Sequence, residues 1–218
     1  MPHDYTYYYI STAIIYALIL ITTWVTVKNW KYLSTTKESI FLPFLCFTIV
    51  IEIISNYYVW ILVKNASIVL DFYTLIAMLF SIYWFYSYLR MKWLAIISSI
   101  LMIASYLISV YYVESYMKSY VDELPAIVIA AALIITLNVF IFFNKMLLNN
   151  KVKKYTNHRP FWITIGLFVF HINAMPLVLF LPNLKRLTWQ VSGVLVFINL
   201  IMYGCFTYAL SLKSARDE

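Results

Sequence analysis

Charged side chains are scarce in this sequence. Only 11% of the 218 residues are charged, whereas 64% are apolar. A water-soluble domain of this size needs more polar surface than such a composition provides, so that class is excluded. The mean hydropathy of +0.83 indicates a membrane protein instead.

Cysteines are few, and catalytic motifs are missing. The two cysteines, Cys46 and Cys205, both lie within apolar runs, which argues against a disulfide framework. The sequence contains no His-Glu-x-x-His, no Gly-Asp protease pair, no Gly-x-Ser-x-Gly and no Walker loop. The segments between the apolar runs are too short to house a soluble active site. We therefore predict that the chain is not an enzyme.

Long apolar runs make up most of the chain. A bilayer core about 30 Å thick requires roughly 20 apolar residues per helix. We predict an all-α membrane protein, a seven-helix transmembrane bundle with short loops that forms a single domain over residues 1–218. No basic segment or small-residue cleavage pattern precedes the first run, so we interpret it as a retained helix. The predicted spans are Tyr5–Val27, Ser39–Leu62, Ser67–Leu89, Trp93–Tyr112, Pro125–Leu148, Pro160–Leu181 and Trp189–Leu212.

Basic residues are divided unevenly between the two sides of this arrangement. Of the 16 Lys and Arg residues, 12 lie in the odd-numbered loops and the C-terminal tail. Basic loops remain in the cytoplasm, so we predict an external N-terminus and a cytoplasmic C-terminus. The net charge of +7 then reflects orientation, and we predict no nucleic-acid partner. The bacterial plasma (inner) membrane is the predicted location, with the lipid bilayer as the surrounding medium.

Two known classes of seven-helix membrane protein share this layout. Sugar-transporter-like proteins repeat a three-helix unit around a linker helix, but the first three and last three spans show no mutual similarity. Microbial rhodopsins carry a lysine in the seventh helix for the retinal Schiff base, and Trp189–Leu212 contains none. Covalent binding of retinal in that manner is therefore excluded.

The start of the sixth span carries a family resemblance. Residues Arg159–Leu167 read Arg-Pro-Phe-Trp-Ile-Thr-Ile-Gly-Leu. This stretch resembles the Phe-Trp-Ile-x-x-Gly start found in small seven-helix membrane proteins common in Bacteroidota. Asp71-Phe72-Tyr73 and the segment Asn199–Tyr203 are also similar to that group. Its members are often associated with sensory or signalling genes, so the resemblance implies a sensory role but assigns no residue a function.

Acidic side chains within the spans are the first candidate site residues, because ionisable groups are costly inside a membrane. Glu52 has Asn56 one turn later on the same helix face. It is either a carboxylate that binds a proton or cation, or a buried group that joins two helices. Asp71 either lines an outward-facing pocket with this pair or caps its own helix.

His171 is the one histidine inside a predicted span. A bis-histidine haem or a histidine zinc site needs further ligands, so we predict no cofactor and no metal. The residue is either a core histidine or a proton relay. The remaining candidates for a ligand or proton pocket are three amides, which usually join helices, and one tyrosine: Asn138, Asn173, Asn199 and Tyr203. Gly193 and Gly204 share a helix face, and we predict that they allow close helix contact.

These residues lead to three functional hypotheses. The first is a non-catalytic sensor or signal-transducing module with an outward-facing polar and aromatic pocket, in which Glu52 and Asn56 face His171 or Asn199. It would act through a signalling or membrane-protein partner at cytoplasmic loops. The alternatives are a small proton- or cation-coupled transporter or channel, and a structural subunit of a membrane complex. Homo-oligomerisation is left open. The predicted partner contacts are Lys151, Lys153, Lys154 and Arg159.

Overall fold

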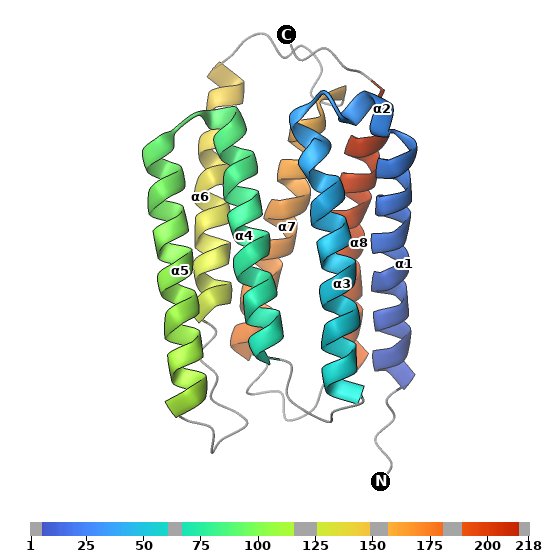
Figure 1. Ribbon diagram of the computed structural model, residues 1–218, viewed down its shortest axis with the longest axis vertical. Helices are drawn as coiled ribbons and strands as arrows, with labels where there is room; N and C mark the ends of the chain where they lie inside the picture. The colour runs from blue at the N-terminus through green and yellow to red at the C-terminus, as the bar shows by residue number, and fades with distance from the viewer. Residues whose placement is uncertain (1–5, 61–66, 116–125, 149–156, 181–188, 214–218) are drawn as a thin grey trace. The chain divides into compact units, whose positions relative to one another are not determined.

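The chain is almost entirely helical. A computed structural model describes residues 6–60, 67–115, 126–148, 157–180 and 189–213, and no β-strand occurs among them. Two short helices, α2 (Trp30–Leu33) and the 3₁₀ helix η1 (Lys37–Ile40), connect the first two long ones. The long helices are α1 (Thr6–Lys28), α3 (Phe41–Trp60), α4 (Ser67–Leu89), α5 (Lys92–Ser115), α6 (Ala126–Leu148), α7 (Arg159–Phe180) and α8 (Trp189–Ser211) (Figure 1).

All seven long helices have the length and apolar character needed to cross a membrane. Their ends lie within a few residues of the predicted spans, so the predicted all-α, seven-helix class is confirmed. Large apolar side chains remain exposed on the helix surfaces, including Trp93 at 77% and Phe140 at 72%. Such exposure is costly in water and favourable in hydrocarbon. The chain is a multi-pass membrane protein.

The helices form two compact units. Unit 1 comprises Met1–Leu45 with Lys151–Glu218, and unit 2 comprises Cys46–Asn150. Unit 1 therefore holds α1, α2, η1, α7, α8 and the first residues of α3, whereas unit 2 holds the rest of α3 with α4, α5 and α6. That the whole chain acts as a single domain stays a prediction.

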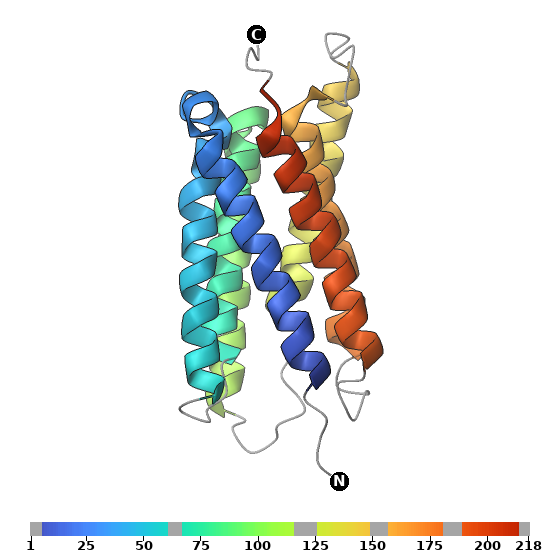
Figure 2. The same cartoon turned by 90° about the vertical axis from the view of Figure 1, so that its right-hand side faces the viewer.

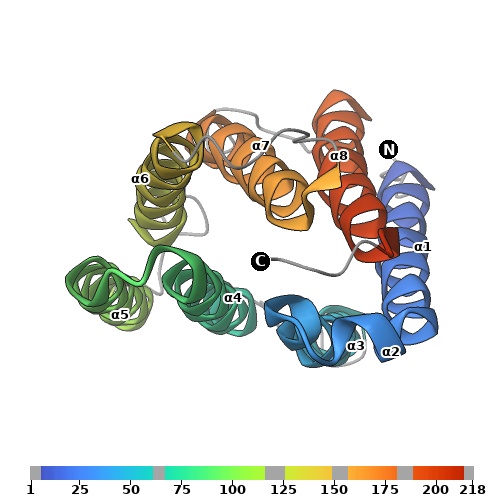
Figure 3. The ribbon, with the colours of Figure 1, turned by 90° about the horizontal axis from the view of Figure 1, so that it is seen from above.

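In unit 1, α8 packs against both α1 and α7 (Figures 2 and 3). The contacts of α1 with α8 show that these two helices run in the same direction. Thr22 Oγ1 lies 2.8 Å from Thr207 Oγ1, and farther along both helices Asn29 Nδ2 donates to the Leu210 carbonyl at 3.2 Å. Hydroxyl and amide contacts between spans are a common means of joining helices in lipid.

The close contact between α7 and α8 involves Gly166. A Cβ atom added there would lie 3.1 Å from Cys205 Cβ, 3.1 Å from the Met202 carbonyl oxygen and 3.1 Å from the ring of Phe206. A Cβ on Gly193 or Gly204 would meet nothing within 4 Å in the described chain. The prediction that Gly193 and Gly204 make the close contact is therefore wrong for this chain. Sharing a helix face does not determine which face meets a neighbouring helix.

In unit 2, α4, α5 and α6 each pack against the other two (Figure 3). Aromatic rings fill the space between α4 and α6: Trp84 and Phe85 are fully buried, and their ring centroids lie 6.3 Å and 6.2 Å from that of Phe142. Lys145 Nζ on α6 donates to the carbonyl of Leu89 at the end of α4, 2.8 Å away. This bond satisfies a helix-terminal carbonyl and places a cation at the negative end of the helix dipole.

Candidate functional site

The first candidate pair lies in the part of α3 that belongs to unit 2. Glu52 and Asn56 are both half-buried, whereas Ile53 beside them is 64% exposed. Asn56 Nδ2 donates to the backbone carbonyl of Glu52 at 2.7 Å. The two residues thus occupy one stripe of α3, as predicted, and this stripe is less exposed than the apolar residue next to it.

Tyr73 of α4 brings a second polar group to this stripe. Its hydroxyl lies 3.4 Å from Thr48 Oγ1, and its ring stacks on that of Phe47 with centroids 6.2 Å apart. The hydroxyl also lies within electrostatic reach of the Glu52 carboxyl group. Sequence reasoning missed Thr48 as a site residue, although its position one turn before Glu52 was a usable signal.

Asp71 is held by the neighbouring helix α5. Its Oδ2 atom accepts a hydrogen bond from the hydroxyl of Ser109, which is 6% exposed. Asp71 is the fifth residue of α4, so it lies inside the helix and its carboxylate joins α4 to α5. Ser109 was also missed, because a single serine in an apolar run carries little information about its partner.

His171 and the three asparagine candidates each bond to their own helix. His171 Nδ1 lies 2.8 Å from the carbonyl of Leu167, one turn earlier. The amides of Asn138, Asn173 and Asn199 donate in the same way to the carbonyls four residues before them, at 2.7 to 2.8 Å. The expected role of such amides in joining helices is therefore not seen in these bonds. Asn138 is buried, whereas Asn173 is exposed.

Asn199 and Tyr203 lie on the buried side of α8. Asn199 is 9% exposed and Tyr203 4%, and the Tyr203 ring packs edge-on against Phe206 with centroids 6.1 Å apart. Gly193 and Gly204 lie on the exposed side. Asn199 therefore lies off the face of α8 that carries these two glycines.

The candidate residues are divided between the two units. Glu52, Asn56, Asp71 and Asn138 belong to unit 2, whereas His171, Asn173, Asn199 and Tyr203 belong to unit 1. That Glu52 and Asn56 face His171 or Asn199 across a common cavity stays a prediction.

Arg159 requires a correction. It was predicted to contact a partner from an exposed loop, but it is the first residue of α7 and is 3% exposed. Its Nε and Nη2 atoms both donate to the carbonyl of Leu212, just after the end of α8. The guanidinium can fork around one acceptor in this way, and a cation is favoured at the end of a helix. The other three predicted contacts, Lys151, Lys153 and Lys154, lie outside the described residues.

The comparisons with known proteins are negative. Comparison with protein-family models, with curated proteins and with solved structures finds no match to this chain. The resemblance to small seven-helix proteins of Bacteroidota stays a prediction. Among the described residues, no group of three or more His, Cys, Asp or Glu side chains is arranged to hold a metal ion.

Proposed function

We propose that this chain is a non-catalytic membrane sensor. A proton, a small cation or another small ligand would bind at the polar residues shared by α3, α4 and α5 of unit 2. The observation that carries the proposal is the hydrogen bond from Ser109 to Asp71, which connects two neighbouring spans through an ionisable group. Glu52 of α3, one turn after Thr48, supplies a second ionisable group, and Thr48 itself contacts the hydroxyl of Tyr73 on α4.

Ligand binding at these carboxyl groups would change how the helices are joined. A carboxylate accepts hydrogen bonds, whereas a protonated carboxyl group donates one as well. A bound cation would compete with Ser109 for the same oxygen atoms of Asp71. In a span, a polar group that loses its partner is costly, so the helices would rearrange to restore one. Binding would thus shift the equilibrium between two helix arrangements.

The output of the sensor would require a separate protein. In this proposal the chain lies in the bacterial inner membrane, with its N-terminus outside and its C-terminus in the cytoplasm. The support is that 12 of the 16 basic residues belong to loops and a tail on one side of the predicted spans. Lys151, Lys153 and Lys154 then form a cytoplasmic basic segment that suits an acidic partner surface. Arg159 is left out of this surface because it is buried.

The rival hypothesis is a small transporter or channel. A transport path needs polar groups that continue from one side of the membrane to the other. In unit 2, the acidic candidates Glu52 and Asp71 lie in the half of the spans opposite Arg90 and Lys92. This one-sided placement favours a sensor over a conducting path, and nothing observed favours a purely structural subunit.

The test compares two serine variants of α5 with two carboxyl variants. Ser109→Ala removes the bond to Asp71, whereas Ser105→Ala is the matched control because Ser105 donates to Leu101 of its own helix. Hydrogen–deuterium exchange of α4 and α5 would be followed in nanodiscs as protons, Na⁺ and K⁺ are titrated. We expect a titration-dependent change in exchange that Ser109→Ala, Asp71→Asn and Glu52→Gln abolish and Ser105→Ala retains.

Three results would count against the sensor. A titration response that is the same in all four variants would remove the proposed site from the mechanism. Flux of protons, Na⁺ or K⁺ into proteoliposomes, lost in Glu52→Gln, would establish the transporter instead. A pull-down in mild detergent that recovers no partner, together with an absent titration response, would also refute the proposal.

A further inference from the structure

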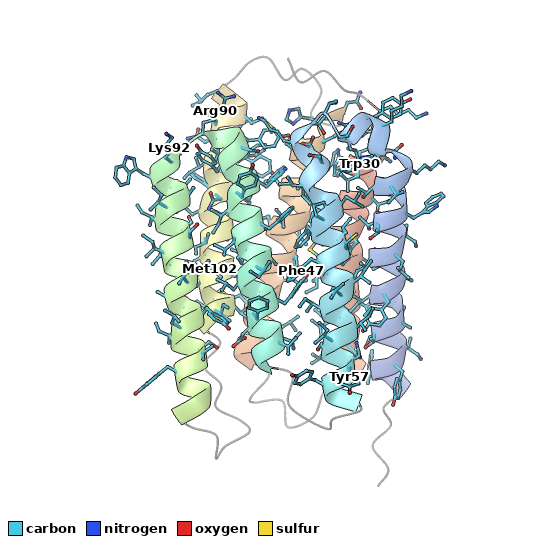
Figure 4. The ribbon with its side chains drawn as sticks, viewed as in Figure 1. Trp30, Phe47, Tyr57, Arg90, Lys92 and Met102 are labelled. Atoms are coloured by element: carbon cyan, nitrogen blue, oxygen red, sulfur yellow. The ribbon has the colours of Figure 1, made fainter. Side chains whose placement is uncertain are left out.

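A groove lies at the turn between α4 and α5 in unit 2. It has a volume of about 440 Å³ and is lined by Tyr83, Tyr86, Ser87, Arg90 and Lys92. Tyr83, Tyr86 and Ser87 share one face of α4, because they follow a spacing of three and four residues. Arg90 comes directly after the last residue of α4, and Lys92 begins α5. Figure 4 shows Arg90 and Lys92 at the same end of these two helices.

Two cations, Arg90 and Lys92, line this groove. Among the described residues, no carboxylate pairs with Arg90 or Lys92, and both side chains are exposed. Lys145 of α6 is bonded to the carbonyl of Leu89 and offsets the negative end of α4. The groove therefore presents an uncompensated positive charge at the end of two spans.

The backbone at Arg90 is a second, independent sign of function. Its φ angle is 55°, and it is the one non-glycine residue with positive φ in the described chain. Its N–H donates to the Tyr86 carbonyl at 2.8 Å, which ends α4 in the way that glycine usually does. Glycine would adopt this conformation without strain. Arginine adopts this conformation at a cost that glycine would not bear, which is consistent with a role for the Arg90 side chain.

The location of the groove points to one kind of ligand. Arg90 lies between the candidate spans Val69–Leu89 and Lys92–Tyr111, so the groove lies at the ends of two candidate membrane spans. The neighbouring Trp93 is 77% exposed, as expected of an indole at the membrane interface. Tyr83 of α4 and Ile96 of α5 also expose apolar surface, 58% and 48%, to which acyl chains can pack.

We propose that this groove binds the headgroup of an anionic phospholipid. Arg90 and Lys92 hold the phosphate, with the guanidinium of Arg90 offering a pair of N–H donors to two phosphate oxygens. The hydroxyl groups of Tyr83 and Tyr86 supply further donors at the wall of the groove. Ser87 lines the groove but donates its proton to the Trp84 carbonyl at 2.7 Å, so it is not counted as a phosphate donor.

The test uses Arg90→Gly and Lys92→Gln, singly and together, with Lys31→Gln as the control. Arg90→Gly removes the cation but suits the backbone conformation, so this variant is expected to fold. Lys31 is an exposed lysine of α2 in unit 1, and its substitution removes the same charge away from the groove. Lipid binding would be measured by native mass spectrometry with added phosphatidylglycerol or phosphatidylcholine, and by thermal unfolding in the same mixtures.

We expect the wild-type chain to retain more phosphatidylglycerol than phosphatidylcholine, and to be stabilised more by phosphatidylglycerol. Each cation removed from the groove should weaken phosphatidylglycerol binding about fivefold, and the double variant roughly 25-fold, while Lys31→Gln binds as the wild type does. Equal retention of phosphatidylglycerol by the double variant would overturn the proposal, as would wild-type protein that does not distinguish the two lipids. Equal stabilisation by inorganic phosphate would identify a free-anion site instead.

Discussion

Replacing Gly166 by alanine tests how tightly α7 and α8 are packed. The new methyl group would lie 3.1 Å from three atoms, and two of these, Cys205 Cβ and the Met202 carbonyl oxygen, are fixed by the backbone of α8. The third atom belongs to Phe206, which is 1% exposed and has no room to turn aside. The contact can be relieved only if the two helices move apart.

The expected magnitude follows from two opposing effects. Overpacking of a well-packed contact typically costs about 1 to 3 kcal/mol. Replacing glycine by alanine within a helix also stabilises the fold by about 1 kcal/mol, because it restricts the unfolded chain, and this offsets part of the overpacking cost. Gly166→Ala should therefore lower the free energy of unfolding by roughly 0 to 2 kcal/mol. Gly204→Ala, where a Cβ meets nothing within 4 Å, should leave it unchanged or raise it.

The comparison of the two variants is the sharpest measurement. Thermal unfolding of both in one detergent should place the Tm of Gly166→Ala below that of Gly204→Ala by about 2 to 12 °C, from roughly 2 to 4 °C per kcal/mol for a chain of this size. The same substitution in neighbouring helices cancels the propensity effect. A Gly166→Ala protein as stable as Gly204→Ala would refute the close contact.

The remaining predictions concern the clamp at the end of α8 and the topology. Arg159→Lys keeps the charge but cannot donate two hydrogen bonds to the Leu212 carbonyl, so it should lower the free energy of unfolding by about 1 to 2 kcal/mol. Denaturation in detergent would measure this effect beside the exposed control Lys213→Gln. Equal stability of the two variants would contradict this role of Arg159. Cysteines introduced at positions 153 and 4 in a cysteine-free background should react with a membrane-impermeant reagent from inside and outside the cell, respectively. Labelling of position 153 in intact cells would reverse the proposed orientation.

The spans were predictable because their signal is local. A helix that crosses hydrocarbon must satisfy its backbone internally over a fixed length, so an apolar run nearly fixes its own ends. Ser67–Leu89 has the same bounds in the prediction and in the structure. The short helices α2 and η1 were missed, because a polar segment of a few residues carries no such length constraint.

The polar contacts were less predictable because they depend on which helix faces which. Glu52 and Asn56 were recognised from their spacing alone, and that spacing holds. The partner of Asp71 is Ser109, which lies 38 residues away in the sequence, and no local pattern connects the two. Arg159 looked like part of a basic loop because the sequence shows its charge and not the carbonyl that it bonds.

The parallel pairing of α1 with α8 has a consequence for biosynthesis. Thr22 and Thr207 are 185 positions apart, so α1 enters the membrane long before α8 is made. Thr22 and Thr26 each donate to a carbonyl four residues earlier in α1, which lets this helix insert with its hydroxyl protons satisfied. Cys46–Asn150 is continuous in sequence and can pack as it emerges, whereas unit 1 closes when α8 arrives. Ribosomes stalled before α8 should therefore yield a folded unit 2 and an unpaired α1 that membrane quality-control proteases recognise.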